Sequence, residues 1–378
     1  MPPCSFFTTL LFLTHFLGGN MNKKLIALAV SAGLALPGLV NAAEVAGKAL
    51  EIYGKAHLSL DSVSAKDAGG ASISNLDLSS NSSRLGFKGE GAVGSMTGFY
   101  KIEASVNMDR EGGALDHRAA YAGLKGGMGS ILAGYRDTPY KDVRGMFDVF
   151  GDTVGDARNI IGSIDASNLF DKRAKNAVMY SSPKSGGFQA NVMYSTSWEN
   201  NTTAQQGQDN NNASLTSINL KYKANALTLA AAWEQQNHVD TTTGDTNRKG
   251  TGTRLVAAYD MGAMRIGLIY ENLDDDTTVA NRRSAYGANF IFKAGEGKVK
   301  LQYIKAGDTD ATSDSGATEI AVGYDYKLAK NSSTYIMYSK VSNDANATYA
   351  MGNGHDNTYT TAAGQDVSAI SVGYIYSF

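Results

Sequence analysis

The sequence predicts an all-β fold: a 16-stranded antiparallel transmembrane β-barrel with a pore-constricting internal loop. Three observations support this fold class. From about residue 48 onward, apolar and polar residues alternate in segment after segment. Only two of the five prolines, Pro139 and Pro183, lie beyond residue 42. The last ten residues form an amphipathic strand, and the chain stops on an aromatic residue, Phe378.

The alternating segments have the length and spacing of membrane-spanning strands. Side chains alternate between the two faces of a strand, and a span of about 9 to 11 residues crosses a bilayer. No helical periodicity persists over the length of a normal helix, and an even number of strands closes a bacterial barrel. The expected strands begin near residues 48, 81, 97, 116, 129, 172, 187, 214, 225, 253, 263, 284, 297, 317, 333 and 367.

The connections between these segments alternate in length. Short turns such as 126–127 and 295–297 contain glycine, whereas polar connections such as 200–212 and 343–365 are long. Short turns on one side and long loops on the other are typical of outer-membrane barrels. A soluble β-sandwich has no reason to keep this asymmetry.

Composition agrees with a barrel and excludes other classes. The mean hydropathy of −0.24 argues against helical spans, but only alternate residues of a barrel strand face lipid. Proline cannot donate to a sheet ladder, so a chain made almost entirely of strands excludes it. The net charge of −2 argues against a nucleic-acid partner.

The C-terminal strand presents one large apolar and aromatic face. Ile370, Val372, Tyr374, Tyr376 and Phe378 share that face, while the opposite face is mostly small. Aromatic residues gather where a barrel wall meets the membrane interface. We therefore expect this strand to close the barrel, with Tyr374, Tyr376 and Phe378 as a C-terminal assembly signal.

The N-terminus indicates export. Residues 21–42 combine a basic start at Lys23 and Lys24, an apolar run and small residues at a cleavage site, as in a secretory signal peptide. Because that signal begins at Met21, residues 1–20 are expected to be a non-native upstream extension. The only cysteine, Cys4, falls in this extension, so residues 43–378 form a cysteine-free barrel domain.

Five strings spread over residues 43–378 resemble the general diffusion porins of the Gram-negative outer membrane. They are 51–55 (EIYGK), 83–90 (SRLGFKGE), 118–124 (RAAYAGL), 178–183 (VMYSSP) and 376–378 (YSF). The resemblance implies a homotrimer in the cell outer membrane that passes ions and small hydrophilic solutes passively and needs no cofactor. It also implies contact with outer-membrane lipid, lipopolysaccharide and the barrel-assembly machinery.

The same resemblance implies a constriction between a loop and the wall. The break in alternation between Tyr135 and Lys172 corresponds to the family's third external loop, although the family's usual acidic tip is not reproduced at 147–152. Strand parity directs Lys55, Arg84, Lys101 and Glu103 into the lumen. The expected acidic loop residues are Asp142, Asp148, Asp152 and Asp156, and the expected basic wall residues are Lys55, Arg84, Lys101, Arg118, Arg173 and Lys175.

Two alternatives remain open. A barrel enzyme needs a nucleophile or water activated by a positioned histidine, and His57, His117, His238 and His355 form no such pattern in the sequence. We therefore expect no catalytic or metal site. A sugar-specific porin or an adhesin would use the same barrel. Arg144, four residues before Asp148, adds a base to the acidic loop, so the sequence leaves the ion preference undetermined.

Overall fold

The computed structural model describes residues 49–66, 70–110, 115–164, 167–168, 170–198, 213–238, 248–276, 281–352, 355, 357–359 and 362–378. The barrel occupies the unit from Glu51 to Phe378. The expected extension 1–20, the signal peptide 21–42 and the 200–212 loop lie outside the described residues. Within the described part, helices are too short or too polar to span a bilayer.

Sixteen antiparallel spans close into a ring, which confirms the predicted β-barrel. The pore-constricting role of an internal loop stays a prediction. The large sheet contains 17 strands, but β2 and β3 both pair with β1 and together form one span. This span breaks at residues 81–83, where Ser82 adopts a positive φ of 51°. The strands are β1 (Glu51–Lys66), β2 (Ser72–Ser80), β3 (Arg84–Val93), β4 (Met96–Ser105), β5 (Asp116–Gly126), β6 (Gly129–Asp137), β9 (Arg173–Ser181), β10 (Phe188–Ser195), β11 (Leu215–Ala224), β12 (Leu227–His238), β13 (Arg248–Asp260), β14 (Met264–Asp276), β15 (Asn281–Ala294), β16 (Gly297–Ala306), β17 (Ala317–Ala329), β18 (Ser332–Asn343) and β19 (Val367–Ser377).

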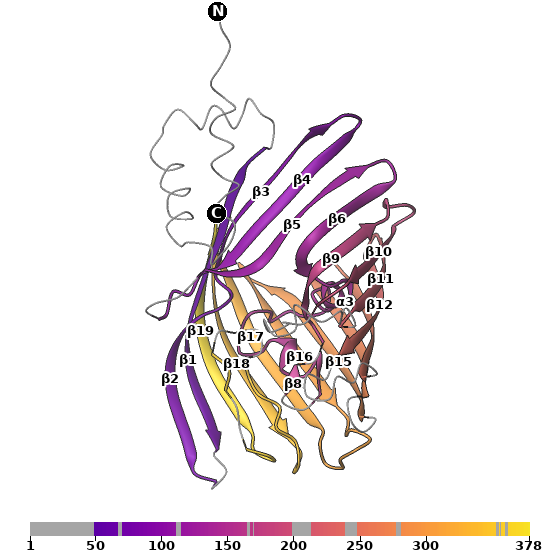
Figure 1. Cartoon of the computed structure of the whole chain (residues 1–378). Coiled ribbons are helices and arrows are strands. Elements are labelled where there is room, and N and C mark those ends of the chain that lie inside the picture. The colour runs from indigo at the N-terminus through magenta and orange to yellow at the C-terminus, as the bar shows by residue number, and fades with distance from the viewer. Residues whose placement is uncertain are drawn as a thin grey trace, which may run out of the picture. The chain divides into compact units, whose positions relative to one another are not determined.

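The two ends of the chain's barrel unit close the ring. β1 pairs with β19 in antiparallel register from Lys55–Ser377 to Ala65–Val367, and Figure 1 shows indigo β1 beside yellow β19. Beyond β19, the Phe378 amide donates to the Gly54 carbonyl at 3.1 Å, and the Gly54 amide donates back at 3.0 Å. The Phe378 ring occupies the place of a Gly54 side chain, since a Cβ there would lie 2.3 Å from it. A glycine at 54 therefore lets the last residue pack against the first strand.

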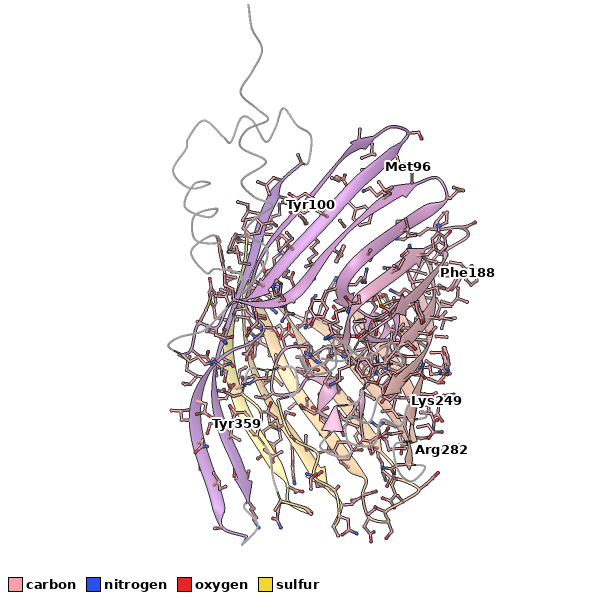
Figure 2. All side chains as sticks on the ribbon, viewed as in Figure 1. Met96, Tyr100, Phe188, Lys249, Arg282 and Tyr359 are labelled. Carbon is pink, nitrogen blue, oxygen red and sulfur yellow. The ribbon has the colours of Figure 1, made fainter. Side chains whose placement is uncertain are left out.

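The outer wall carries a broad band of apolar side chains. Large hydrophobic side chains alternate outward along the strands and are about half exposed, for example Leu60 on β1, Ile102 on β4 and Ile336 on β18. Figure 2 labels Met96 and Phe188 at the short-turn ends of their strands, and Lys249 and Arg282 toward the opposite, long-loop ends. A band of exposed apolar side chains around a barrel fits a lipid surface.

The long connection between β6 and β9 turns into the barrel. It contains α3 (Pro139–Arg144), the 3₁₀ helix η1 (Ala157–Asn159) and the short strands β7 (Ser163–Ile164) and β8 (Ser167–Asn168). Thr138 caps α3, because its hydroxyl accepts the Lys141 amide at 3.2 Å, and Pro139 starts the helix. Phe147, Phe150 and Ile160 are buried against inward-facing residues of β12–β19. We call residues 138–172 the inner loop.

Candidate functional site

Glu271 on β14 anchors the inner loop to the wall. Its carboxylate accepts the Tyr140 hydroxyl at 2.9 Å and the Gly162 amide at 2.8 Å, so it holds both halves of the loop. Two wall cations neutralise it: Arg254 on β13 at 2.5 Å and Arg283 on β15 at 3.2 Å. All three wall side chains are fully buried. A buried network of charged and hydrogen-bonded groups of this kind fixes one loop position.

Asp152 lies at the point where the inner loop meets the opposite wall. Its Oδ2 lies 3.1 Å from both Lys55 Nζ on β1 and Arg84 Nη2 on β3, and Arg158 contacts its other oxygen at 3.1 Å. Burial disfavours its ionised form, but the three cations outweigh burial and hold the pKa of Asp152 well below its ordinary value. Asp152 therefore carries its negative charge throughout the physiological pH range.

The backbone at this point is held as well. Asp152 adopts a positive φ of 62°, a conformation that Asp and Asn tolerate better than most residues. Its amide donates to Asp156 Oδ2 at 2.7 Å. Asp156 also caps η1 by accepting the Arg158 amide at 2.8 Å. These contacts aim the Asp152 carboxylate at the wall.

The other three predicted loop carboxylates are placed differently from one another. Asp142 contacts the wall at Arg136 (2.9 Å) and Lys221 (3.9 Å). Asp148 and Asp156 instead point into the loop, where Arg144 contacts both of them and Arg158 contacts Asp156 at 2.8 Å. The expectation that all four face the wall cations therefore fails for Asp148 and Asp156, because the loop carries its own arginines.

The predicted basic wall residues gather around Glu103 on β4. Lys101 contacts this carboxylate at 3.0 Å, Arg118 at 3.1 Å and Arg84 at 3.9 Å. The Tyr53 hydroxyl also donates to it at 2.7 Å. All of these side chains face the lumen, as strand parity predicts.

A cavity of about 140 Å³ opens beside Glu103. Five cations line it (Arg84, Lys101, Arg118, Arg136 and Arg173), and so do two carboxylates, Glu103 and Asp137. Arg173 contacts Asp137 at 3.0 Å. Lys175 is not among the lining residues. It lies within the irregularity of the β6–β9 register, between Ala174 and Ala177, and precedes Asn176, whose φ is positive at 51°. Five of the six predicted wall residues thus share one region. Lys55 joins it by its contact with Asp152, and the other four line the cavity.

Several residues of this region carry no specific signal in the sequence. Arg158, which contacts Asp152 from within the loop, lies outside any strand, so strand parity says nothing of it. Arg136 and Asp137 close β6 and face the same cavity. The anchor residues Arg254, Glu271 and Arg283 occupy inward positions of three adjacent strands, which parity alone identifies as lumen-facing. Their contact with the inner loop depends on tertiary structure.

The predicted C-terminal residues lie on the outer wall. Tyr374 and Tyr376 are 45% and 39% exposed, and Phe378 is 61% exposed. The Tyr376 and Phe378 ring centroids lie 6.3 Å apart. This pair forms part of an outward aromatic surface beside the β1–β19 closure. Its role as an assembly signal remains a prediction.

Comparisons with known proteins agree with this architecture. The family model described as Gram-negative porin matches residues 27–346. The chain is 27% identical over 330 residues to the monosaccharide porin of a Halomonas species, covering 80% of this chain and 86% of the relative. It is 22% identical over 333 residues to the major outer membrane protein P.IB of Neisseria meningitidis serogroup B, covering 84% and 92% of the two chains.

Solved structures share the fold. An anion-selective porin from Comamonas acidovorans superposes with a TM-score of 0.73 at 22% identity, covering 87% of this chain and 99% of that chain. The trimer form of OmpT from Vibrio cholerae superposes with a TM-score of 0.62 at 17% identity, covering 86% and 99%.

The fold, the outward apolar surface and the comparisons point to one conclusion. The barrel resides in the outer membrane of a Gram-negative bacterium, and its closed wall surrounds a lumen lined by charged side chains. Proteins of this family and fold are passive channels rather than enzymes, and one structurally similar barrel was solved in a trimer form. The chain is a general diffusion porin and belongs to the Gram-negative porin family.

Proposed function

We propose that this porin is a passive channel with an anion preference, narrowed by the inner loop at the level of Asp152. The observation that carries the proposal is the charge of the cavity beside Glu103, where five cations stand against two carboxylates. Lys55 and Asp152, at the edge of the same region, neutralise each other. The excess of three positive charges attracts anions and repels cations.

The size of this preference follows from simple electrostatics. Two unit charges about 8 Å apart interact by roughly 0.5 kcal/mol at the dielectric constant of water and by about 2 kcal/mol at an effective value near 20. These energies bias the passage of ions without excluding either sign. With a Debye length of about 10 Å at 0.1 M salt, the bias weakens as salt rises.

The side chains named above support a slit rather than a wide pore. The inner loop packs on β12–β19 through its apolar residues and reaches across to β1 and β3 through Asp152. The remaining path then runs along β3–β6 and β9, where the cations lie. The loop acids and wall bases set a field across this path, which orients dipolar solutes.

The proposal also covers assembly and chemistry. We propose that three copies assemble, as in the trimer form of the Vibrio cholerae structure, and that the outer wall contacts lipid and lipopolysaccharide. Among the described residues, no group of three or more His, Cys, Asp or Glu side chains is arranged to hold a metal ion. We propose transport without catalysis and without a cofactor.

One relative suggests a narrower function. The Halomonas relative is named a monosaccharide porin, so a sugar-specific channel is the second candidate. Such a channel would present a file of aromatic side chains along the path, whereas Tyr270, Tyr286, Tyr303 and Tyr338 face outward and are exposed. The outward position of these tyrosines and the positive charge of the cavity both favour the first candidate.

Swelling of proteoliposomes with three sugars of equal size tests both candidates. Glucosamine, glucose and glucuronate differ mainly in charge, which is positive, neutral and negative at pH 7. The proposal expects glucuronate to enter fastest and glucosamine slowest. Fastest entry of glucose would favour the sugar-specific channel, and fastest entry of glucosamine would contradict the anion preference.

A further inference from the structure

The chain between β18 and β19 also turns back into the barrel. Its described residues are 344–352, 355, 357–359 and 362–366, and we call them the second inner segment. Ala347, Tyr349 and Met351 are fully buried. They belong to the same apolar cluster as the inward-facing residues Val63 on β1 and Val341 on β18. The segment therefore packs against the lumen side of the wall.

Three polar contacts fix this segment to three different elements. His355 Nε2 lies 2.8 Å from Asp61 Oδ2 on β1. The Asn357 side chain donates to Ser79 Oγ on β2 at 3.0 Å. The Gly352 amide donates to Asn159 Oδ1 of the inner loop at 2.8 Å. The segment thus bridges the wall at β1–β2 and the inner loop.

Both side chains of the His355–Asp61 contact are fully buried. Asp61 Oδ2 also accepts the Ser59 hydroxyl at 3.0 Å, and Ser59 Oγ accepts the Asn81 side chain at 2.7 Å. The chain of contacts thus runs from the break between β2 and β3 to the segment. The second ring nitrogen of His355 lies 2.9 Å from the Asn357 carbonyl oxygen.

Both ring nitrogens of His355 are therefore engaged, one by the wall and one by the segment itself. A contact of this kind orients the segment, since breaking a buried and hydrogen-bonded pair leaves an unpaired buried group. An exposed loop lying over the barrel mouth needs no such contact. Because the segment packs on the lumen side at β1–β2, it lies against the part of the wall next to the basic cavity of β3–β6 and β9.

We propose that the second inner segment sets the width of the channel on its β1–β2 side, and that His355 is its positioning residue. The proposal adds a second size-determining element to the inner loop. It needs only that the barrel conducts, and it does not depend on the anion preference. Neutral solutes therefore test it separately from the proposed function.

The test compares the entry of glucose and of the neutral trisaccharide raffinose into proteoliposomes. We expect His355→Ala to raise the raffinose-to-glucose rate ratio and the single-channel conductance. His355→Gln retains a side-chain N–H donor for Asp61 and should keep the wild-type ratio. Asp61→Ala removes the acceptor on β1 and should raise the ratio. His117, exposed on β5, provides the control variant His117→Ala.

A disulfide provides the second test. The only cysteine of the sequence is Cys4, so a Ser79→Cys and Asn357→Cys pair in a chain expressed from residue 21 has no competing thiol. In the His355→Ala background, oxidation of this pair should restore the wild-type ratio, and reduction should remove that effect. Wild-type ratio and conductance in both His355→Ala and Asp61→Ala would overturn the proposal. So would an oxidised pair that leaves the raised ratio of His355→Ala unchanged.

Discussion

Replacing Asp152 by Asn tests the electrostatics of the channel most sharply. The amide keeps the shape of the side chain, and Asn tolerates the positive φ of 62° at this position. The variant removes one negative charge that lies 3.1 Å from both Lys55 and Arg84. The positive excess of the slit therefore rises by one charge, and anions gain over cations.

The expected change follows from the energy of a permeating ion near this charge. At about 8 Å in water, a unit charge contributes roughly 0.5 kcal/mol, and screening at 0.1 M salt reduces this to about 0.2 kcal/mol. The effect has opposite signs for an anion and a cation, so the two contributions add in the permeability ratio. We expect the anion-to-cation ratio to rise about two- to sixfold.

The assay is the reversal potential across a planar bilayer under a KCl gradient, with single-channel conductance recorded in parallel. Asp310→Asn is the control, because Asp310 is an exposed residue of the β16–β17 loop. An unchanged potential in Asp152→Asn, or a shift toward cations, would show that Asp152 does not face the ion path. A shift of equal size in Asp310→Asn would refute the local explanation.

Three further predictions concern pH, stability and assembly. Burial, together with the charges of Arg173 and Arg158, lowers the pKa of Lys141 to about 8, although nearby Asp137 acts in the opposite direction. The positive charge of Lys141 is therefore lost as pH rises through 8. The anion preference, measured by reversal potential, should decline between pH 7 and 9 in wild type but not in Lys141→Gln. Glu271→Ala leaves two buried arginines without their carboxylate, which costs about 3 to 5 kcal/mol of folding stability. It should lower the temperature at which the folded barrel loses its faster gel mobility, whereas Glu296→Ala in an exposed turn should leave that temperature unchanged. Phe378→Ala removes the ring that covers Gly54. If Phe378 directs assembly, the yield of heat-modifiable barrel in outer-membrane fractions should fall at equal expression. An unchanged yield would show that Phe378 is not part of the assembly signal.

The alternation of the sequence was sufficient to predict the strands. Fifteen of the sixteen expected starting positions agree with the observed spans within about five residues. The exception is the second span, whose first half, β2, begins at Ser72. Residues 72–80 precede a break at Ser82, and a pattern interrupted by a positive φ does not appear as one strand. The interruption in alternation between β6 and β9 likewise marked the inner loop.

The site was predicted only in part, for a physical reason. Strand parity states which face of the wall a side chain occupies, so Arg84 and Glu103 were assigned to the lumen correctly. Parity does not state which inward residue meets a loop more than one hundred positions away in the chain. The contact between Tyr140 and Glu271 is of this kind. The same limit explains why Asp148 was expected to face the wall when a loop arginine, Arg144, contacts it instead.

The docking of the second inner segment was also not predicted. Its sequence is polar and long, as expected of an external loop, and the buried Tyr349 and Met351 are isolated apolar residues within it. His355 was considered only as a catalytic or metal-binding residue. Its position beside Asp61, nearly three hundred residues earlier in the chain, depends entirely on the closure of the barrel.

The reversal potential of the wild-type porin under a KCl gradient tests the central claim most directly. Five cations against two carboxylates beside Glu103 predict a potential of the sign given by chloride preference, larger at 0.1 M than at 1 M salt. A potential of the opposite sign would contradict this account, because it would mean that ions pass along a surface other than the basic wall of β3–β6 and β9.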